Sequence, residues 1–174
     1  MRETRFPKKN RHVIRLRACA KINLDLRIIG KRQDGYHELC TLMHTIELQD
    51  DLEMKLLDRA EIQLRCTGFR GVPEGRDNLA YRAADAMLAA FAPEAGIAIH
   101  LHKRIPMGSG LGGGSSDCAC VIRGLAKLLA LRIDHDQLVR IAGRLGSATV
   151  LLLHSPCQRS GSRESDWSRD HSPP

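Results

Sequence analysis

Aromatic residues are scarce in this 174-residue sequence, in which they make up 3% of the chain and include a single tryptophan. Hydrophobic residues nevertheless account for 43%, so a chain of this length can bury a core, and that core is expected to be aliphatic. No segment approaches the roughly 20 consecutive apolar residues that cross a bilayer. The first 17 residues also lack the apolar segment of a secretory signal. We therefore expect neither a membrane span nor a secretory leader.

Metal-binding cysteine patterns are absent as well. The six cysteines show no CxxC spacing, and no histidines stand at zinc-finger distance from them. Cys118 and Cys120 lie two residues apart on an expected helix, so they point to different faces and cannot chelate one metal ion. Scattered cysteines of this kind indicate reduced thiols and a cytoplasmic protein.

The positive charge is concentrated at one end of the chain. The net charge is +7, and residues 1–17 carry seven Lys or Arg against the single acid Glu3. We interpret residues 1–12 as a basic flexible arm or an over-long start, with a weak polyanion contact as the less favoured alternative. Because the remainder is almost neutral, a nucleic-acid partner is not expected.

Alternating hydrophobicity predicts a sheet of at least four strands. In residues 21–29, Ile22, Leu24, Leu26 and Ile28 alternate with polar residues, which predicts a half-buried strand. Three further segments, residues 40–48, 51–57 and 60–66, show similar alternation, and Asp50 with Asp51 is interpreted as a turn between the first two. A fifth β-like segment covers residues 96–104.

Helical spacing follows in three places. Asp77 or Asn78 can cap a helix that ends near residue 91, apolar residues at helical spacing predict a second helix over 117–131, and Asp134 can cap a third over 135–145. From Ser147 onward the composition becomes rich in serine and proline. We therefore expect residues 147–174 to be disordered.

A glycine-rich loop precedes the second predicted helix. Five of the 15 glycines fall within residues 108–114, followed by two serines. Because glycine costs backbone entropy, so many of them favour a loop whose amides wrap a phosphate at the start of a helix. The alternative is a flexible turn with a serine cap. The loop lacks the lysine of a Walker A motif, and Pro106 argues against the dinucleotide pattern that residues 108–113 also satisfy.

Two long motifs carry a resemblance to a known family. PMGSGLGGGSSD at residues 106–117 resembles the ATP-binding motif of the GHMP small-molecule kinases, and ACAKINLDLRIIGKRQDGYHEL at residues 18–39 is similar to an N-terminal signature within that family. The resemblance implies an α+β, two-layer sheet-and-helix N-terminal domain over residues 13–146, with the C-terminal domain missing. It also implies ATP-dependent phosphorylation of a hydroxyl on a small cytidine-diphosphate substrate used in isoprenoid synthesis.

The same resemblance implies the site residues. Lys21 would stabilise the reacting hydroxyl, Asn23, Tyr36 and His37 would bind the substrate, and Ser116 would lie near Mg²⁺. ATP would be held by Asn78, Pro106, Met107, Gly108, Ser109, Gly110, Leu111, Gly112, Gly113, Gly114, Ser115 and Ser116. Simpler interpretations stay open: Lys21 as a strand residue, Asn78 as a helix cap, Tyr36 as a packing residue and His37 as an exposed loop residue.

The sequence departs from the family pattern after residue 146. Family members carry a catalytic aspartate in a Gly-(Ala or Ser)-Asp-Val-Pro segment, whereas this chain has Gly146-Ser147-Ala148-Thr149-Val150. We hypothesise that residues 147–174 are an out-of-frame tail, and we predict weak or absent kinase activity. The alternative function is a non-catalytic nucleotide-binding fragment. Substitution of the missing base by Asp25 or Asp117, and the oligomeric state, stay open.

Overall fold

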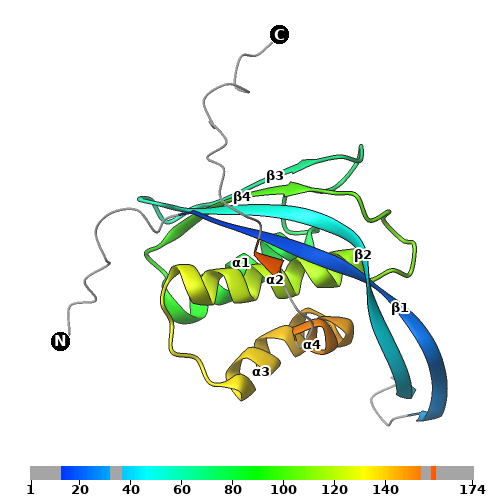
Figure 1. The fold of residues 1–174 in the computed structure, drawn as a ribbon. Coiled ribbons are helices and arrows are strands. Elements are labelled where there is room, and N and C mark those ends of the chain that lie inside the picture. Colours follow the sequence, from blue (N-terminus) through cyan, green and yellow to red (C-terminus); the bar gives the residue numbers. More distant parts are fainter. Residues whose placement is uncertain (1–12, 32–36, 154–157, 160–174) are drawn as a thin grey trace.

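The computed structural model describes residues 13–31, 37–153 and 158–159 (Figure 1). Within these residues, five strands and four helices follow one another along the chain. They are β1 (Val13–Lys31), β2 (His37–Leu57), β3 (Ile62–Thr67), α1 (Leu79–Phe91), β4 (Gly96–His102), α2 (Gly113–Leu128), α3 (His135–Leu145), α4 (Ser147–Leu153) and β5 (Gln158–Arg159). The expected basic arm at residues 1–12 lies outside the described residues.

The strands form one mixed sheet in the order β3-β4-β2-β1-β5. β3 and β4 pair in parallel, and α1 supplies the crossover between them that a parallel pair requires. The other neighbouring strands run antiparallel. All four helices lie on the same face of the sheet (Figure 1), which confirms the predicted two-layer α+β architecture.

An aliphatic core fills the space between the sheet and the helices, as the composition predicts. Its largest fully buried apolar side chains come from β2, β4, the segment after β4, α1 and α2: Leu52, Met54, Ile97, Ile99, Leu101, Ile105, Met87, Val121, Ile122 and Leu125. Tyr81 and Phe91 pack against this core only partly buried. None of the helices in the described ranges is long and apolar enough to span a membrane.

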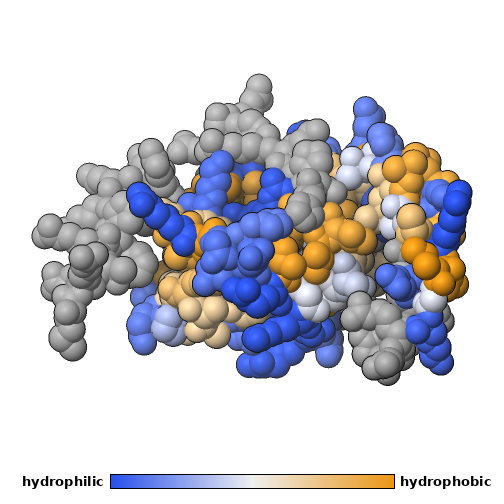
Figure 2. All heavy atoms as spheres, turned by 90° about the horizontal axis from the view of Figure 1, so that it is seen from below, coloured by the Kyte–Doolittle hydropathy of each residue, from blue (hydrophilic) through white to orange (hydrophobic). Residues whose placement is uncertain are grey.

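The far halves of β1 and β2 continue beyond the helices as a projecting hairpin (Figure 1). Leu24, Leu26 and Ile28 are 60%, 52% and 67% exposed there. The expectation of a half-buried strand over residues 21–29 is therefore wrong, because no helix reaches this part of the sheet. The buried side of β1 lies earlier, in the segment from Ile14 to Ala20. Hydrophobic atoms gather at the hairpin end of the molecule in Figure 2.

Asp50 and Asp51 do not form a turn, which corrects the expectation of two short strands in this region. β2 runs without interruption through both residues, with Asp50 opposite Ala18 and Asp51 opposite Arg17 of β1. Asp50 is completely buried. An isolated carboxylate would be unfavourable in this position, so its partners must come from elsewhere in the fold.

Of the three helices predicted from the sequence, two begin at the predicted capping residues. The Asn78 side chain caps α1 by accepting from the Ala80 amide, and Asp134 forms a capping box with Gln137 at the start of α3. α2 instead begins at Gly113, four residues before the predicted start at Asp117. The glycines that suggested only a loop therefore also supply the first turn of this helix.

Residues 147–153 form α4, so the expectation of disorder is wrong for this segment. Thr149 and Leu152 are buried, and α4 packs against α2 and α3. The apolar residues 150–153 give this segment a hydrophobic surface to bury. The expectation of disorder rested on the serine-rich composition of the residues that follow. The other residues expected to be disordered, 154–157 and 160–174, lie outside the described ranges.

One cysteine departs from the expectation of reduced thiols. Cys19, Cys40, Cys66 and Cys118 are free, whereas Cys120 is disulfide-bonded. Its sulfur lies 3.6 Å from the Arg17 carbonyl oxygen, and β5 pairs with Leu16 and Arg17. The chain near β5 therefore returns to the neighbourhood of Cys120, a proximity that sequence spacing does not reveal.

Candidate functional site

The glycine-rich loop joins β4 to α2 and has a backbone shape that requires glycine. Gly108, Gly110 and Gly112 have φ angles of 69°, 76° and 73°, in the left-handed region that other residues rarely adopt. At Gly112 space is restricted as well, because a Cβ atom would lie 3.1 Å from both Cγ and Cε of Lys21. The loop and β1 are therefore in close contact at Lys21.

The start of α2 is open to an anion. Its N-cap residue, Gly112, has no side chain to cap the helix, and the next two residues are also glycines. The backbone amides of the first turn point along the positive end of the helix dipole. Without a side-chain cap, these amides are suited to receive phosphate oxygens.

A pocket of about 330 Å³ opens beside the loop. Most residues that the sequence predicts for ATP line it: Asn78, Pro106, Met107, Gly108, Ser109, Gly110, Gly112, Gly113, Gly114 and Ser115. Val72, Pro73 and Leu79 add apolar surface to its wall, and Lys103 and Asp117 add charge. A volume of this size, with apolar walls and a few polar groups, is typical of small-molecule sites.

Lys21 forms two hydrogen bonds with Gly110 and Leu111 of the glycine-rich loop. Its backbone amide donates to the Leu111 carbonyl oxygen at 2.9 Å, and its ammonium group donates to the Gly110 carbonyl oxygen at 2.6 Å. Thus the structure brings the two motifs that carry the family resemblance, which are about 90 residues apart in the sequence, into direct contact.

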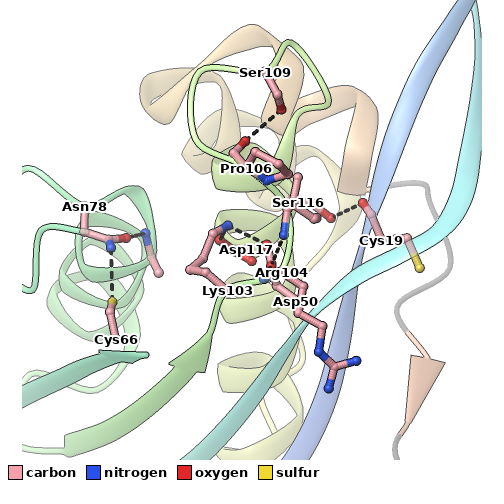
Figure 3. Close-up of polar contacts among 12 residues, drawn as sticks. Cys19, Asp50, Cys66, Asn78, Lys103, Arg104, Pro106, Ser109, Ser116 and Asp117 are labelled. Atoms are coloured by element: carbon pink, nitrogen blue, oxygen red, sulfur yellow. Dashed lines mark hydrogen bonds and ion pairs between the residues drawn. The ribbon is translucent and has the colours of Figure 1, made fainter. Parts of the chain in front are cut away.

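A buried cluster of three charged residues lies at the base of the loop, and the sequence did not predict that these residues contact one another. The Lys103 ammonium group bridges the carboxylates of Asp50 and Asp117, and donates to Asp117 Oδ2 at 2.6 Å (Figure 3). The three side chains are no more than 4% exposed. The positions of Lys103 and Asp117 on either side of the loop could have indicated their ion pair from the sequence. Asp50 could not be included, because it is distant in the sequence and was interpreted as a turn residue.

The surroundings of this cluster shift its protonation. Burial raises the pKa of Asp117 to about 8, with the nearby Asp50 carboxylate adding to the effect. Burial by itself lowers the pKa of Lys103, but the two carboxylates outweigh it, so the net shift is upward. One lysine buried between two carboxylates leaves a net negative charge, which is consistent with the upward direction of both pKa shifts.

Asn78 is confirmed as a helix cap, and both the oxygen and the nitrogen of its side-chain amide form hydrogen bonds within the protein. Oδ1 accepts from the Ala80 amide at 2.8 Å, and Nδ2 donates to the Pro73 carbonyl oxygen at 2.7 Å. Its Nδ2 also lies 3.6 Å from the Cys66 sulfur (Figure 3). Asn78 therefore positions the residues around Pro73 at the pocket wall.

Two residues predicted for ATP do not line the pocket. Leu111 is not among the lining residues, and Ser116 is buried, with its hydroxyl group donating to the Cys19 carbonyl oxygen at 2.8 Å (Figure 3). The geometry therefore does not support Ser116 as the Mg²⁺ ligand. Its neighbour Ser115 does line the pocket.

The residues predicted for the cytidine substrate lie away from this pocket or outside the description. Asn23 is exposed on β1, two residues beyond Lys21. His37 begins β2 opposite Lys31, and Tyr36 lies outside the described residues. Asp25, one of the suggested replacements for the missing base, forms an ion pair with Arg27 at 2.9 Å on the projecting hairpin.

Comparison with known proteins agrees with this fold. The family model for the GHMP kinases N terminal domain matches residues 78–152, which extends the resemblance beyond its expected end at Gly146. The chain belongs to the GHMP kinase family, and the described residues have the fold of its N-terminal domain.

Within this family, its curated relatives include 4-diphosphocytidyl-2-C-methyl-D-erythritol kinases. The chain is 46% identical to the one from Geobacter sp. strain M21 over 134 residues, which cover 77% of this chain and 48% of that protein. It is 40% identical to the one from Syntrophus aciditrophicus over 150 residues, covering 86% of this chain and 53% of that protein. The chain thus spans about half the length of these relatives.

Solved structures also support membership of the GHMP kinase family. A crystal structure of 4-(cytidine 5'-diphospho)-2C-methyl-D-erythritol kinase superposes with a TM-score of 0.70 and 38% identity, over 84% of this chain and 51% of that one. Homoserine kinase from Cytophaga hutchinsonii superposes with a TM-score of 0.62 over 82% of this chain and 43% of that one. Its 18% identity shows a shared fold alone.

Proposed function

We propose that this chain forms the ATP-binding half of a kinase that phosphorylates the 2-hydroxyl of 4-diphosphocytidyl-2-C-methyl-D-erythritol, in non-mevalonate isoprenoid precursor synthesis. The observation that carries the proposal is the uncapped, glycine-built start of α2 beside a pocket and Lys21. The names of its curated relatives supply the substrate. A cytoplasmic location is part of the proposal, because ATP and small phosphorylated metabolites are found there.

The residues of the pocket suit a nucleoside triphosphate. The amides of Gly113, Gly114 and Ser115 would receive phosphate oxygens, and the apolar wall at Val72, Pro73 and Leu79 would lie against the base. Ser115 would contribute a hydroxyl group to Mg²⁺. The metal ion, when bound, neutralises the charge that develops on the transferring phosphoryl group.

Lys21 would act at the reacting end of the triphosphate. Its ammonium group already lies against Gly110 of the loop, and a cation there stabilises the charge on the phosphoryl group and on the attacking oxygen. Asn23 follows Lys21 on β1, and His37 is the first residue of β2. We propose these two residues, together with Tyr36, as substrate-binding residues.

A second candidate function, nucleotide binding without turnover, is favoured by one observation. Ala148 occupies the position at which the family pattern has its catalytic aspartate, at the start of α4. The two acids suggested as replacements are engaged elsewhere, because Asp25 pairs with Arg27 and Asp117 is buried against Lys103. A missing general base costs about 10²- to 10⁴-fold in rate.

Two measurements on the purified chain distinguish these functions. Titration calorimetry with a non-hydrolysable ATP analogue and Mg²⁺ tests nucleotide binding, and a coupled assay with the cytidine-diphosphate substrate tests turnover. We expect binding with little turnover, and an increase in turnover in Ala148→Asp, with Ala148→Asn as the matched uncharged control. Absence of nucleotide binding would overturn both functions, and turnover at the roughly 1 to 100 per second of ordinary kinases would exclude the second.

A further inference from the structure

A buried charged bridge, defined as Asp50, Lys103 and Asp117, connects three separate parts of the fold beneath the glycine-rich loop (Figure 3). Asp50 belongs to β2, Lys103 directly follows β4, and Asp117 lies in the first turns of α2. Replacing a buried ion pair by apolar residues is often neutral or stabilising. Stability alone therefore does not explain why three charged side chains occupy this position.

Asp50 holds the segment that leads into the loop. Its Oδ1 atom accepts hydrogen bonds from the backbone amides of Arg104 at 2.5 Å and Ile105 at 2.8 Å. These are the two residues before Pro106, where the loop begins. One carboxylate thus fixes the entry into the loop to the centre of β2.

Lys103 and Asp117 hold the other end of the loop. The contact between them attaches α2 to the end of β4, so the entry and the exit of the loop are held by the same bridge. The two ends are also in close contact, because a Cβ atom on Gly113 would lie 2.8 Å from Cγ2 of Ile105. The spacing of the two ends determines the curvature of residues 106–112 and therefore the direction of their amides.

We propose that Asp50, Lys103 and Asp117 are positioning residues that set the phosphate-binding shape of the glycine-rich loop. This inference depends on the proposed nucleotide-binding function and extends it to three residues outside the set predicted to bind the nucleotide. The bridge acts on the phosphates through the loop, so it affects the triphosphate strongly and the nucleoside weakly. Asp117 also lines the pocket, and its Oδ1 atom accepts no hydrogen bond from the described residues.

The decisive variant is Asp117→Ala, which detaches α2 from Lys103 and leaves Lys103 paired with Asp50. Binding of an ATP analogue, ADP and adenosine is measured by calorimetry in the presence of Mg²⁺. We expect the ATP analogue to bind about tenfold or more weakly, as loss of a hydrogen bond to a charged group implies, and adenosine to bind within about twofold of the wild type. Asp117→Asn keeps an acceptor of the same size and is expected to restore most of the affinity.

Glu53→Gln is the matched control. Glu53 also lies on β2 and forms an ion pair with Arg15 at 2.5 Å, away from the loop. Its replacement should leave all three affinities unchanged. Equal weakening of the ATP analogue and adenosine in Asp117→Ala, or an unchanged affinity for the ATP analogue, would overturn the proposed positioning role.

Hydrogen exchange separates this inference from the proposed function. If the wild type binds no nucleotide, the proposed function fails, and the positioning role is then judged by amide exchange of residues 104–112. Faster exchange there in Asp117→Ala, but not in Glu53→Gln, supports the role, and unchanged exchange overturns it. If Asp117→Ala does not fold, Lys103→Met with Asp117→Leu replaces it, because this pair leaves Asp50 with its two backbone donors.

Discussion

Gly112 is the residue at which the loop, β1 and α2 meet. Its left-handed backbone disfavours a side chain, and a Cβ atom would lie only 3.1 Å from Lys21. A run of glycines in the sequence indicates a phosphate loop, but it does not indicate which glycine is essential. That distinction depends on φ angles and on β1, which lies about 90 residues earlier in the chain.

We predict that Gly112→Ala weakens binding of an ATP analogue about tenfold. A side chain in the left-handed region costs about 1 to 3 kcal/mol, and the loop relieves this strain by moving away from Lys21. Gly143→Ala is the control, because Gly143 lies within α3 and its nearest neighbour to a new Cβ is 3.9 Å away. That variant should gain about 0.5 to 1 kcal/mol of stability. Calorimetry and chemical denaturation measure both effects, and an unchanged affinity in Gly112→Ala would contradict the prediction.

Cys66 provides a pH-dependent prediction at the same scale. Burial, and then the negative charges of Glu74 and Asp117, raise the pKa of its thiol to about 11 from a usual value of 9.0. Only the thiolate reacts with alkylating reagents, so the alkylation rate should keep rising up to about pH 11. Peptide mass spectrometry after brief exposure to iodoacetamide measures this rate, with Cys66→Ser identifying the signal. A rate that levels off by pH 9 would show that the thiol is not shifted.

The projecting β1–β2 hairpin is the element that the sequence described least well. Alternation predicted its strands, but it did not reveal that the buried and exposed parts divide along the length of β1 instead of across its two faces. Burial depends on where the helices end, and that is a property of the assembled fold. The caps of α1 and α3, in contrast, depend on residues within a few positions of each other and were predicted from the sequence.

We predict that the apolar side chains of this hairpin contribute little to folding. Replacing Leu24, Leu26 and Ile28 together by threonine should change the unfolding free energy by no more than about 0.5 kcal/mol per site. It should also reduce self-association, because an exposed apolar patch is removed. Leu52→Ala, in the buried half of β2, should cost about 2 to 5 kcal/mol. Denaturation and sedimentation velocity test both statements, and a large stability loss in the triple variant would indicate that the hairpin is covered in solution.

Charge is a property of the whole molecule that the sequence locates without any structure. Deleting residues 2–11 removes a net charge of +4 and leaves +3. We predict that this deletion lowers the salt concentration needed to elute the protein from a heparin column, while RNA retention at physiological salt is absent before and after it. Specific RNA retention that the deletion abolishes would show that the arm contacts nucleic acid.

The end of the family resemblance also concerns the whole chain. The family match runs to residue 152, six residues beyond the point at which the sequence pattern departs from the family. The hypothesis that residues 147–174 are translated out of frame stays a prediction. It predicts that sequencing the gene across and downstream of codon 146 uncovers an insertion or deletion, and an intact, transcribed frame that encodes this protein would contradict it.

The long-range contacts explain why the site was only partly predictable. The glycine-rich loop and Lys21 carry local signals that a family resemblance can detect. Asp50 carries none, because its function depends on Lys103, which lies 53 residues further along the chain. The sequence therefore identified the atoms expected to meet a ligand but missed the buried residues that hold them in place.

Lys21 stands at the point where β1 leaves the packed part of the molecule, and its backbone amide donates to the Leu111 carbonyl oxygen. β1, which continues into the projecting hairpin, is thus joined to the glycine-rich loop by a hydrogen bond between backbone atoms, which does not depend on any side chain. A ligand that restrained the hairpin at Lys21 would therefore also restrain the loop, because this hydrogen bond joins the two segments.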